Sequence, residues 1–592
     1  MSDAVAQGAD LLAQGDFKGA ERIALDRLAM REDPAALHLL GVVRIHQEKP
    51  EDAVKHLTRS LQLHPRQAAV LLNLGKAYMA AGRAALAQKA LAEAVIVRPD
   101  LADAWFTLGE LAGKQGDDAT AEANFRKAAA LGHLPAQLLL GLALCNTHNP
   151  AEAENILARG LAQAEEPRLK TAFMHQLACA QRAQGKRNEA LANFTEAGRR
   201  DPGLNADLSR ADLLLELSRP DEALAVLEER LKQDPGDALT HHAYNHILYR
   251  LGRDQEFLKS YDSAPPLTPL QLAKAGFLLM AGRNEEAHAL YAAIMKREPA
   301  DISAAIGAAV SLAKMGQVGT AMAPLEHARR LYPRSVPVLQ ELAALALQAR
   351  DEKKSAAFAE QALKLAPDDY LSLALMGTAW RMAGDERDEA LNGYDDLVQV
   401  FDLEPPRGFA SMAEFNQALN GELSGLHNTP REPLSQSLRQ GSQSLGALFG
   451  VGNALVERLK ERLEESLHRY IGGIKAETGH PFRGRQRQGF RFSGSWSSRL
   501  RDSGFHTNHI HPEGWISSCY YVAVPDAARD EREKQGWIKF GEPNFECGLG
   551  FRRAIQPKPG RLVLFPSYMW HGTILFHDKA QRTTIAFDAV PR

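Results

Sequence analysis

The chain has 592 residues, and its 70 Lys and Arg against 73 Asp and Glu give a formal net charge of −3. That near balance excludes a protein whose main role is to coat nucleic acid or an anionic membrane. With 45% apolar and 24% charged residues, the composition is that of a folded chain and not of a disordered one.

Targeting and redox signals favour a cytoplasmic protein. No apolar run approaches the roughly 18 residues that a membrane span needs, and the acidic N-terminus lacks the apolar core of a secretory signal. The four cysteines are scattered and form no CxxC pair, which favours a reducing compartment.

Internal repeats fill the Ala- and Leu-rich part of the chain, up to about residue 395. A mostly small residue recurs at intervals close to 34, a second small residue follows twelve positions later in most repeats, and a proline often follows twelve after that. This pattern predicts two antiparallel helices per repeat that meet at small residues, the second ended by proline. The first small residues are Gly8, Gly41, Gly75, Gly109, Gly141, Ala178, Ala211, Asn245, Ala275, Ala309, Ala343 and Gly377.

The pattern, fullest around Trp105 and Gly109, resembles the tetratricopeptide repeat family, in about twelve copies over residues 1–396. The resemblance implies a superhelical solenoid whose concave face binds a protein or peptide; a spacer or an oligomerisation surface is the alternative. The repeat near Asn245 departs from the pattern, because Phe257 replaces an expected Ala and the next interval is the shortest. We expect a kink or a widened groove there, unless the departure is only sequence drift.

The sequence pattern of residues 397–488 predicts a connector and helices that support the next domain. Prolines punctuate the first part, around a short helix near Ser411–Leu426. Apolar residues every four positions from Leu455 to Ile471 predict an amphipathic helix over 451–474, which covers a sheet of the next domain or, less in keeping with its length, forms a coiled coil. A basic patch, Arg483, Arg485 and Arg487, follows and is interpreted as a solvated loop rather than a nucleic-acid contact.

From residue 489 the apolar residues alternate with polar ones, and turn residues separate short runs. This pattern predicts a sandwich or jelly roll over 489–592. The chain as a whole is therefore expected to be an α + β multidomain protein, with an all-α solenoid followed by a β-domain with flanking helices. The expected strands begin near Phe490 and continue as Trp515–Val524, Trp537–Phe540, Arg561–Phe565, Trp570–Phe576 and Thr583–Val590.

Three histidines in this region have the spacing of a metal site. His509 and His511 alternate, so on an extended segment they point to the same side, and His571 lies on another expected strand. Three nitrogen ligands on one face leave positions open for substrate and oxygen, as a catalytic iron site requires. Arg582, eleven residues later, is suited to grip a carboxylate with its planar fork.

The segments HTNHIHPEGWISSCYYV, LFPSYMWHGTI and QRTTIAF resemble the 2-oxoglutarate and Fe(II)-dependent oxygenases, especially bacterial ones with an H-x-H-P motif before an S-x-x-Y-Y strand. The resemblance implies a double-stranded β-helix (jelly-roll) fold that binds Fe(II), 2-oxoglutarate and molecular oxygen. It implies that His509 and His571 are the first and distal iron ligands and that Arg582 pairs with the 2-oxoglutarate carboxylate. Thr584 and Tyr521 match positions that contact this co-substrate.

His511 departs from the family pattern, because the superfamily usually has Asp or Glu at this position. Three histidine ligands would make the site one charge more positive. Alternatively, Glu513 or Asp526 enters the metal shell, or His506 replaces one of the pair.

Three functions remain open from the sequence. The favoured one is a 2-oxoglutarate/Fe(II)-dependent hydroxylase whose repeats deliver a protein or peptide substrate, with no nucleic-acid or membrane partner. The second is a repeat scaffold whose barrel has lost turnover, and the third is a three-histidine iron dioxygenase that does not use 2-oxoglutarate. The expected domains are 1–396 (repeats), 397–488 (connector and helices) and 489–592 (oxygenase core).

Overall fold

The computed structural model describes residues 3–146, 149–427, 429–434, 436–450, 452–485 and 489–591. The chain forms two compact units, Met1–Ala206 and Asp207–Arg592. The unit boundary therefore lies inside the repeats, while the functional division at residues 396 and 488 stays a prediction. Among the described helices, none is long and apolar enough to cross a membrane.

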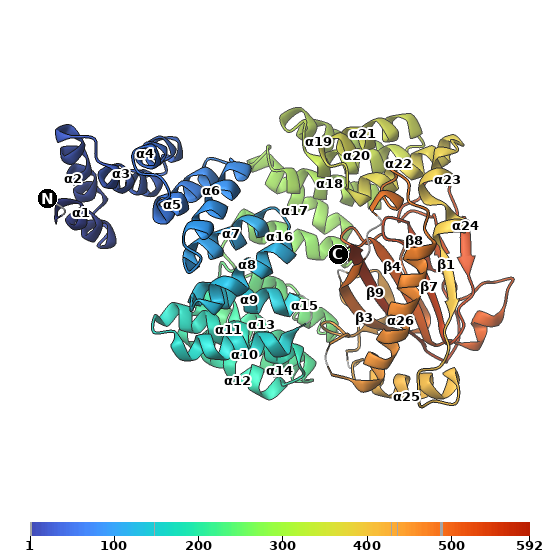
Figure 1. The fold of residues 1–592 in the computed structure, drawn as a ribbon. Coiled ribbons are helices and arrows are strands. Elements are labelled where there is room, and N and C mark those ends of the chain that lie inside the picture. Colours follow the sequence, from blue (N-terminus) through green and yellow to red (C-terminus); the bar gives the residue numbers. More distant parts are fainter. Residues whose placement is uncertain are drawn as a thin grey trace. The chain divides into compact units, whose positions relative to one another are not determined.

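The first unit is a row of antiparallel helix pairs, as the repeat pattern predicts (Figure 1). At Gly75 an added Cβ would lie 2.5 Å from the Leu91 side chain of the following helix, and Gly41, Gly109 and Gly141 are equally close to their partners. The recurring small residues thus mark the contact between the two helices of each repeat. The helices are α1 Asp3–Ala13, α2 Phe17–Met30, α3 Pro34–His46, α4 Pro50–Leu63, α5 Ala68–Ala80, α6 Ala84–Val97, α7 Ala102–Lys114, α8 Asp118–Ala130, α9 Leu134–Asn146, α10 Pro150–Gln163, α11 Pro167–Ala183 and α12 Arg187–Arg200; the 3-10 turn η1 Pro202–Leu204 follows.

The second unit continues the repeats and carries the β-domain. Its last repeat is cut short, because α23 spans only six residues before Gly393 ends it in the left-handed conformation. The repeat helices are α13 Ala206–Glu216, α14 Pro220–Gln233, α15 Ala238–Arg250, α16 Thr268–Met280, α17 Asn284–Arg297, α18 Ile302–Lys314, α19 Val318–Leu331, α20 Val336–Gln348, α21 Glu352–Leu365, α22 Tyr370–Ala383, α23 Arg387–Asn392 and α24 Tyr394–Leu397.

The irregular repeat near Asn245 lacks its second helix. After α15 the chain forms turns and a short 3-10 segment, η2 Lys259–Tyr261. The Asn245 amide donates hydrogen bonds to the His241 carbonyl (2.8 Å) and the Ser260 hydroxyl (2.7 Å) and accepts one from the Leu258 amide (2.7 Å). Asn245, a polar residue at the position where other repeats have a small one, thus stabilises a loop in place of the second helix of the repeat.

The β-domain consists of two antiparallel sheets, compatible with the expected jelly roll. The six-stranded sheet has the order β1-β7-β4-β9-β3-β2 and the three-stranded sheet β6-β5-β8. Sequence alternation predicted β3 to β5 and β7 to β9, but missed the short edge strands β1, β2 and β6. The strands are β1 Gln399–Asp402, β2 Leu438–Gln443, β3 Phe490–His506, β4 Ile516–Ala523, β5 Ile538–Phe540, β6 Arg553–Ile555, β7 Arg561–Pro566, β8 His571–Thr573 and β9 Arg582–Pro591.

The amphipathic helix expected over 451–474 is α26 (Ala454–Gly473); Val451 lies outside the described residues. Its buried Leu459, Leu463 and Leu467 share one apolar core with Ile585 and other residues of the six-stranded sheet. Figure 1 shows α26 across this sheet, with α25 (Met412–Ser424) beside the same domain. The prediction of a helix that covers a sheet is confirmed.

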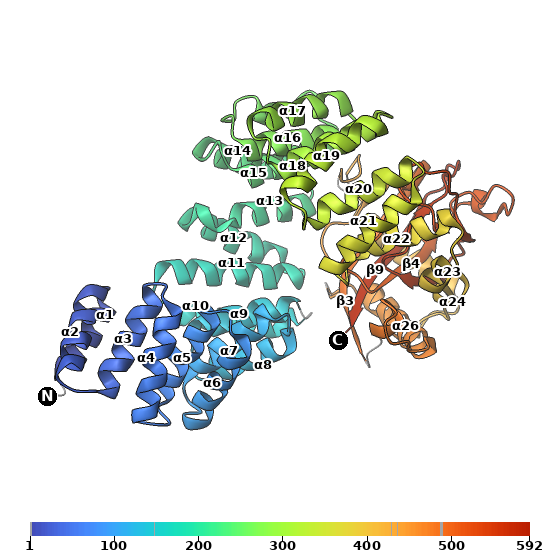
Figure 2. The ribbon, with the colours of Figure 1, turned by 90° about the horizontal axis from the view of Figure 1, so that it is seen from above.

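The last repeats pack directly on the β-domain, as Figures 1 and 2 show for α20 to α22. Trp570 donates its indole N–H to the Thr378 hydroxyl (3.2 Å), and the Tyr568 hydroxyl bonds the Leu391 carbonyl (2.7 Å). Arg485 of the basic patch pairs with Asp368 and bonds Tyr370, while Arg487 lies outside the described residues. These repeats and the sheets therefore fold as one body.

Replacing Gly75 with Ala should locally destabilise its repeat. The new Cβ would overlap buried Leu91, and overpacking of this kind costs about 1–3 kcal/mol. The control is Gly113→Ala in α7, because the only atom near the added Cβ is the Ala121 side chain, at 4.0 Å. The higher helix propensity of Ala should there raise the free energy of unfolding by about 0.5–1 kcal/mol. Hydrogen exchange of the α5–α6 amides should accelerate only in the first variant; equal exchange in both would contradict the packing argument.

Candidate metal centre

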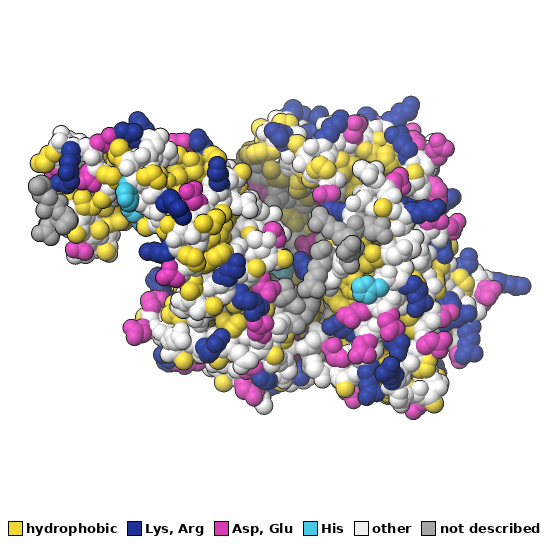
Figure 3. Space-filling view, viewed as in Figure 1, with side chains coloured by type: hydrophobic (Ala, Val, Ile, Leu, Met, Phe, Trp, Pro, Cys, Tyr) yellow, Lys and Arg dark blue, Asp and Glu magenta, His cyan; other side chains and the backbone are white. Residues whose placement is uncertain are grey.

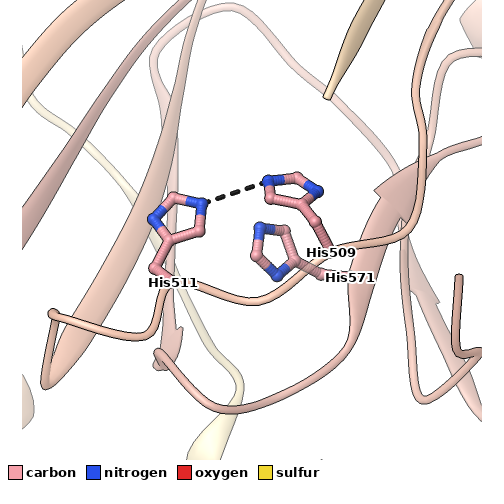
Figure 4. A group of neighbouring side chains, drawn as sticks. All are labelled: His509, His511 and His571. Atoms are coloured by element: carbon pink, nitrogen blue, oxygen red, sulfur yellow. Dashed lines mark hydrogen bonds between the residues drawn. The ribbon is translucent and has the colours of Figure 1, made fainter. Parts of the chain in front are cut away.

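Three histidines meet between the two sheets' ends, from two parts of the β-domain. His509 and His511 lie in the segment between β3 and β4, and His571 begins β8. The His509 backbone N–H donates to the His571 carbonyl (2.9 Å), and the His571 backbone N–H donates to the His509 carbonyl (3.0 Å), so the two residues are paired as in a sheet. One ligand atom from each ring lies within 4.8 Å of the others, and Figure 4 shows the rings facing one another.

Each ring is oriented through its Nδ1 atom. Nδ1 of His509 lies 2.8 Å from the Thr507 carbonyl, and Nδ1 of His571 lies 3.0 Å from the Met569 carbonyl. Because a carbonyl oxygen only accepts hydrogen bonds, both Nδ1 atoms must carry the proton. The Nε2 atoms are then bare, which is how a metal-ligating histidine is usually arranged.

The Nε2 atoms of His509 and His511 are close enough for a single cation to bridge them. Nε2 of His509 lies 3.1 Å from Nε2 of His511. Burial and the charge of His511 lower the pKa of His509 to about 3, and burial and the neighbouring imidazoles lower the pKa of His571 well below its usual value. Protons therefore compete weakly for these positions at neutral pH, and the three residues fit a divalent metal ion.

A carboxylate that the sequence reasoning missed completes the group. Both oxygens of Asp588 lie 2.7 Å from Nδ1 of His511, and the Ser517 hydroxyl donates to the same carboxylate (2.6 Å). Asp588 is on β9, and alternate residues from Arg582 through Thr584 to Asp588 line one cavity. This two-residue period from Arg582 was the signal that could have identified it.

The alternative ligands from the sequence lie elsewhere. Asp526 is 83% exposed and pairs with Arg529, and exposed Glu513 lines the cavity outside the histidine group. His506 approaches the Ser437 hydroxyl through Nδ1 (3.1 Å). That hydroxyl also lies 3.3 Å from Nε2 of His509, so it borders the candidate metal position.

The cavity beside the histidines has a volume of about 660 Å³, and the positively charged side chain of Arg582 forms part of its wall. Arg582 is 1% exposed and donates Nε–H to the Gly536 carbonyl (3.1 Å), but its Nη1 finds no well-aligned partner among the residues described. Its guanidinium carbon lies 5.0 Å from the centre of the Tyr521 ring. The Tyr521 hydroxyl likewise has no well-aligned partner among the described residues, although Cys519 and Arg582 lie close to it. Thr584 is buried on the same wall. These groups fit a bound carboxylate.

Replacing Asp588 with Asn should weaken metal binding about ten- to a hundredfold, because His511 loses the anion that orients it. Anaerobic Fe(II) or Co(II) titration measures this affinity. Asp502→Asn is the control, since Asp502 also contacts a histidine, His577, but is exposed and outside the cavity lining. Equal affinities in wild type and Asp588→Asn would contradict a positioning role.

Comparisons with known protein families found matches in two parts of the chain. Residues 494–588 match the family model described as "Putative 2OG-Fe(II) oxygenase". Tetratricopeptide repeat models match residues 5–68, 44–111, 102–131 and 181–247. No curated protein matched the chain.

Solved structures similar to the chain include yeast Tom70, with 17% identity over 65% of this chain and 96% of that one and a TM-score of 0.33. Pseudomonas aeruginosa pilF has 18% identity over 35% and 93%, with a TM-score of 0.32. At these values the likeness carries no functional inference. The family models show that this chain joins tetratricopeptide repeats to a C-terminal domain, residues 494–588, that matches the model of 2OG-Fe(II) oxygenases.

Proposed function

We propose that the protein is a 2-oxoglutarate- and Fe(II)-dependent oxygenase of the hydroxylase type. The observation that carries this proposal is one cavity that contains both a convergent histidine group and a buried guanidinium, Arg582, that forms no ion pair with any residue the structure describes. An unpaired buried charge costs several kcal/mol, and a bound carboxylate would remove that cost. An iron ion with 2-oxoglutarate as co-substrate supplies the oxidising chemistry of such a site.

In this proposal His509, His511 and His571 hold Fe(II) through Nε2, and Arg582 binds the distal carboxylate of 2-oxoglutarate. Thr584 and the Tyr521 hydroxyl add hydrogen bonds to the same carboxylate. Burial of Tyr521 raises its pKa well above the usual value, so the phenol keeps its proton and remains a donor.

Asp588 supplies a negative charge next to the third histidine, His511, which replaces the carboxylate ligand of most of the superfamily. The carboxylate that most of the superfamily places on the metal stands here one step back, against Nδ1 of His511. The Asp588 carboxylate would make His511 a stronger ligand of the metal ion and would offset part of the extra positive charge of a three-histidine site. The iron-containing cavity would then be close in overall charge to one with a carboxylate ligand.

The two alternatives leave observations unexplained. A three-histidine dioxygenase without 2-oxoglutarate gives the unpaired Arg582 no role. An inactive scaffold has no need to keep three imidazoles whose ligand atoms lie within 4.8 Å of one another.

We further propose that the repeats recruit a protein or peptide. Part of the repeat surface in the second unit is already occupied by the chain itself, because buried Cys547, with Phe545 and Leu549, packs in the core of α18 to α22. Arg381, near the end of α22, donates hydrogen bonds to the carbonyls of Gly541 (2.5 Å) and Gly550 (2.7 Å) and so stabilises the position of this segment. Recruitment would therefore use other repeats, including those of the first unit.

The test is anaerobic titration with Fe(II) and 2-oxoglutarate, followed by the visible charge-transfer band of the chelate. Wild type should show the band, His571→Ala should lose it, and Arg582→Gln should bind 2-oxoglutarate at least about thirtyfold more weakly. Arg561→Gln is the matched control, because Arg561 pairs with Asp402 outside the cavity lining.

Each failure has a distinct meaning. Iron binding without a chelate band would indicate the dioxygenase that does not use 2-oxoglutarate. No iron binding in wild type would leave the scaffold, and an Arg582→Gln affinity equal to that of Arg561→Gln would remove Arg582 from the co-substrate site.

A further inference from the structure

The three residues before the distal histidine of the candidate metal centre, Tyr568, Met569 and Trp570, connect it to the repeats. All three side chains are buried. The carbonyl of Met569, the middle residue, accepts the hydrogen bond from Nδ1 of His571 (3.0 Å) that orients this ring. A displacement of the tripeptide would therefore turn the ring whose Nε2 atom faces the candidate metal position.

Tyr568 and Trp570 lie on either side of Met569, and both side chains are bonded to repeat helices. The Trp570 indole N–H donates to the Thr378 hydroxyl of α22 (3.2 Å), and the Tyr568 hydroxyl donates to the Leu391 carbonyl of α23 (2.7 Å). Because the residues before and after Met569 are both held, the carbonyl of Met569 is held as well. The repeats thus fix the group that orients the distal histidine.

The short last repeat helix provides one of these acceptors. α23 has 6 residues, whereas α21, the corresponding helix of the preceding repeat, has 14. Gly393 ends α23 in the left-handed conformation, and the carbonyls in the last turn of a helix have no intrahelical donor. The Leu391 carbonyl is in this turn, where it accepts from Tyr568. The early helix end thus places an acceptor beside the tripeptide.

A second connection runs from α22 to the backbone of Trp570. Arg381 donates Nη1–H to the Gly541 carbonyl (2.5 Å), and the Gly541 amide donates to the Trp570 carbonyl (2.8 Å). The ring of Phe545, which packs on the repeats, lies edge-on to the Trp570 ring at a centroid distance of 6.3 Å. Both the indole and the carbonyl of Trp570 are therefore linked to α22, next to a proposed metal ligand.

These contacts are short-range and directional. Thr378 is 5% exposed, and its hydroxyl donates to the Ala374 carbonyl one turn earlier (2.7 Å). Its single proton is thus used, and its oxygen is left to accept the Trp570 N–H. Figure 3 shows acidic and basic side chains intermixed over the visible face, with no single charged surface among the described residues drawn there. The visible face thus gives no sign that attraction between charged surfaces does this work instead.

We propose that α22 and α23 position His571 in the metal centre, with Thr378 and the Leu391 carbonyl as the positioning groups. They act through Trp570 and Tyr568, and neither Thr378 nor Leu391 lines the cavity. The inference rests on the metal centre of the proposed function and deepens it, because it makes the last repeats part of that site. By linkage, a metal ion that orders His571 should also stabilise α22 and α23.

The test uses Thr378→Val in the full chain, which keeps the shape of the side chain and removes the acceptor for the Trp570 indole. Co(II) should bind about three- to tenfold more weakly, less than the loss of a direct partner of a ligand, and its visible d–d bands should shift. Thr378→Ser should restore both. The matched control is Thr107→Val in α7 of the first unit, where a buried threonine also donates to the carbonyl four residues earlier (2.7 Å).

Hydrogen exchange adds a readout that a merely structural role would not move. Co(II) should slow exchange of the α22 and α23 amides in wild type and in Thr107→Val, and this protection should be reduced in Thr378→Val. In metal-free protein, the amides of residues 569–573 should exchange faster in Thr378→Val than in Thr107→Val. If Thr378→Val does not fold, Tyr568→Phe takes its place with the same expectations, because it removes only the hydroxyl that reaches Leu391.

The outcomes separate this positioning role from the proposed function. Equal Co(II) affinity and d–d bands in wild type and Thr378→Val, an equal loss in Thr107→Val, or full metal protection of α22 and α23 in Thr378→Val would overturn it. No Co(II) binding to wild type would refute the proposed metal centre. The metal-free exchange of residues 569–573 would then still decide the connection: faster exchange in Thr378→Val supports it, and unchanged exchange overturns it.

Discussion

The candidate site depends on one backbone interaction, the reciprocal hydrogen bonds between His509 and His571. This pairing joins the segment after β3 to the start of β8 and brings two imidazole rings to a centroid distance of 4.2 Å. The His511 amide then bonds the Ser567 carbonyl (2.8 Å), which fixes the third ring beside them. Side-chain geometry suited to a metal is thus set by main-chain bonds, which bulky substitutions elsewhere on the surface would leave intact.

Strand β9 connects the two charged parts of the cavity. Arg582 and Asp588 lie on the same face of this strand, about 20 Å apart at 3.3 Å per residue. One end places a cation where a co-substrate carboxylate is proposed to bind, and the other places an anion behind His511. A rigid central strand, paired with β3 and β4, holds both groups at a fixed separation.

The repeats have two different relations to the chemistry. The helices from α16 onward fold in the same compact unit as the sheets, contribute Met280 to the cavity, and enclose the segment around Cys547. They are therefore part of the proposed enzyme body. The repeats of Met1–Ala206 form a separate compact unit, which suits them to contact a partner without changing the packing around the metal centre.

The sequence by itself determined the repeat array, the helix over the sheet and the main strands, because each follows from a local period of side chains. It also singled out the three histidines and Arg582, whose types and spacing have few other uses. Only the tertiary structure brought Asp588 to His511, paired His509 with His571, and replaced a helix after Asn245 by a loop. These contacts join residues far apart in the chain, or depend on one hydrogen bond that competes with a helix, and no local period records them.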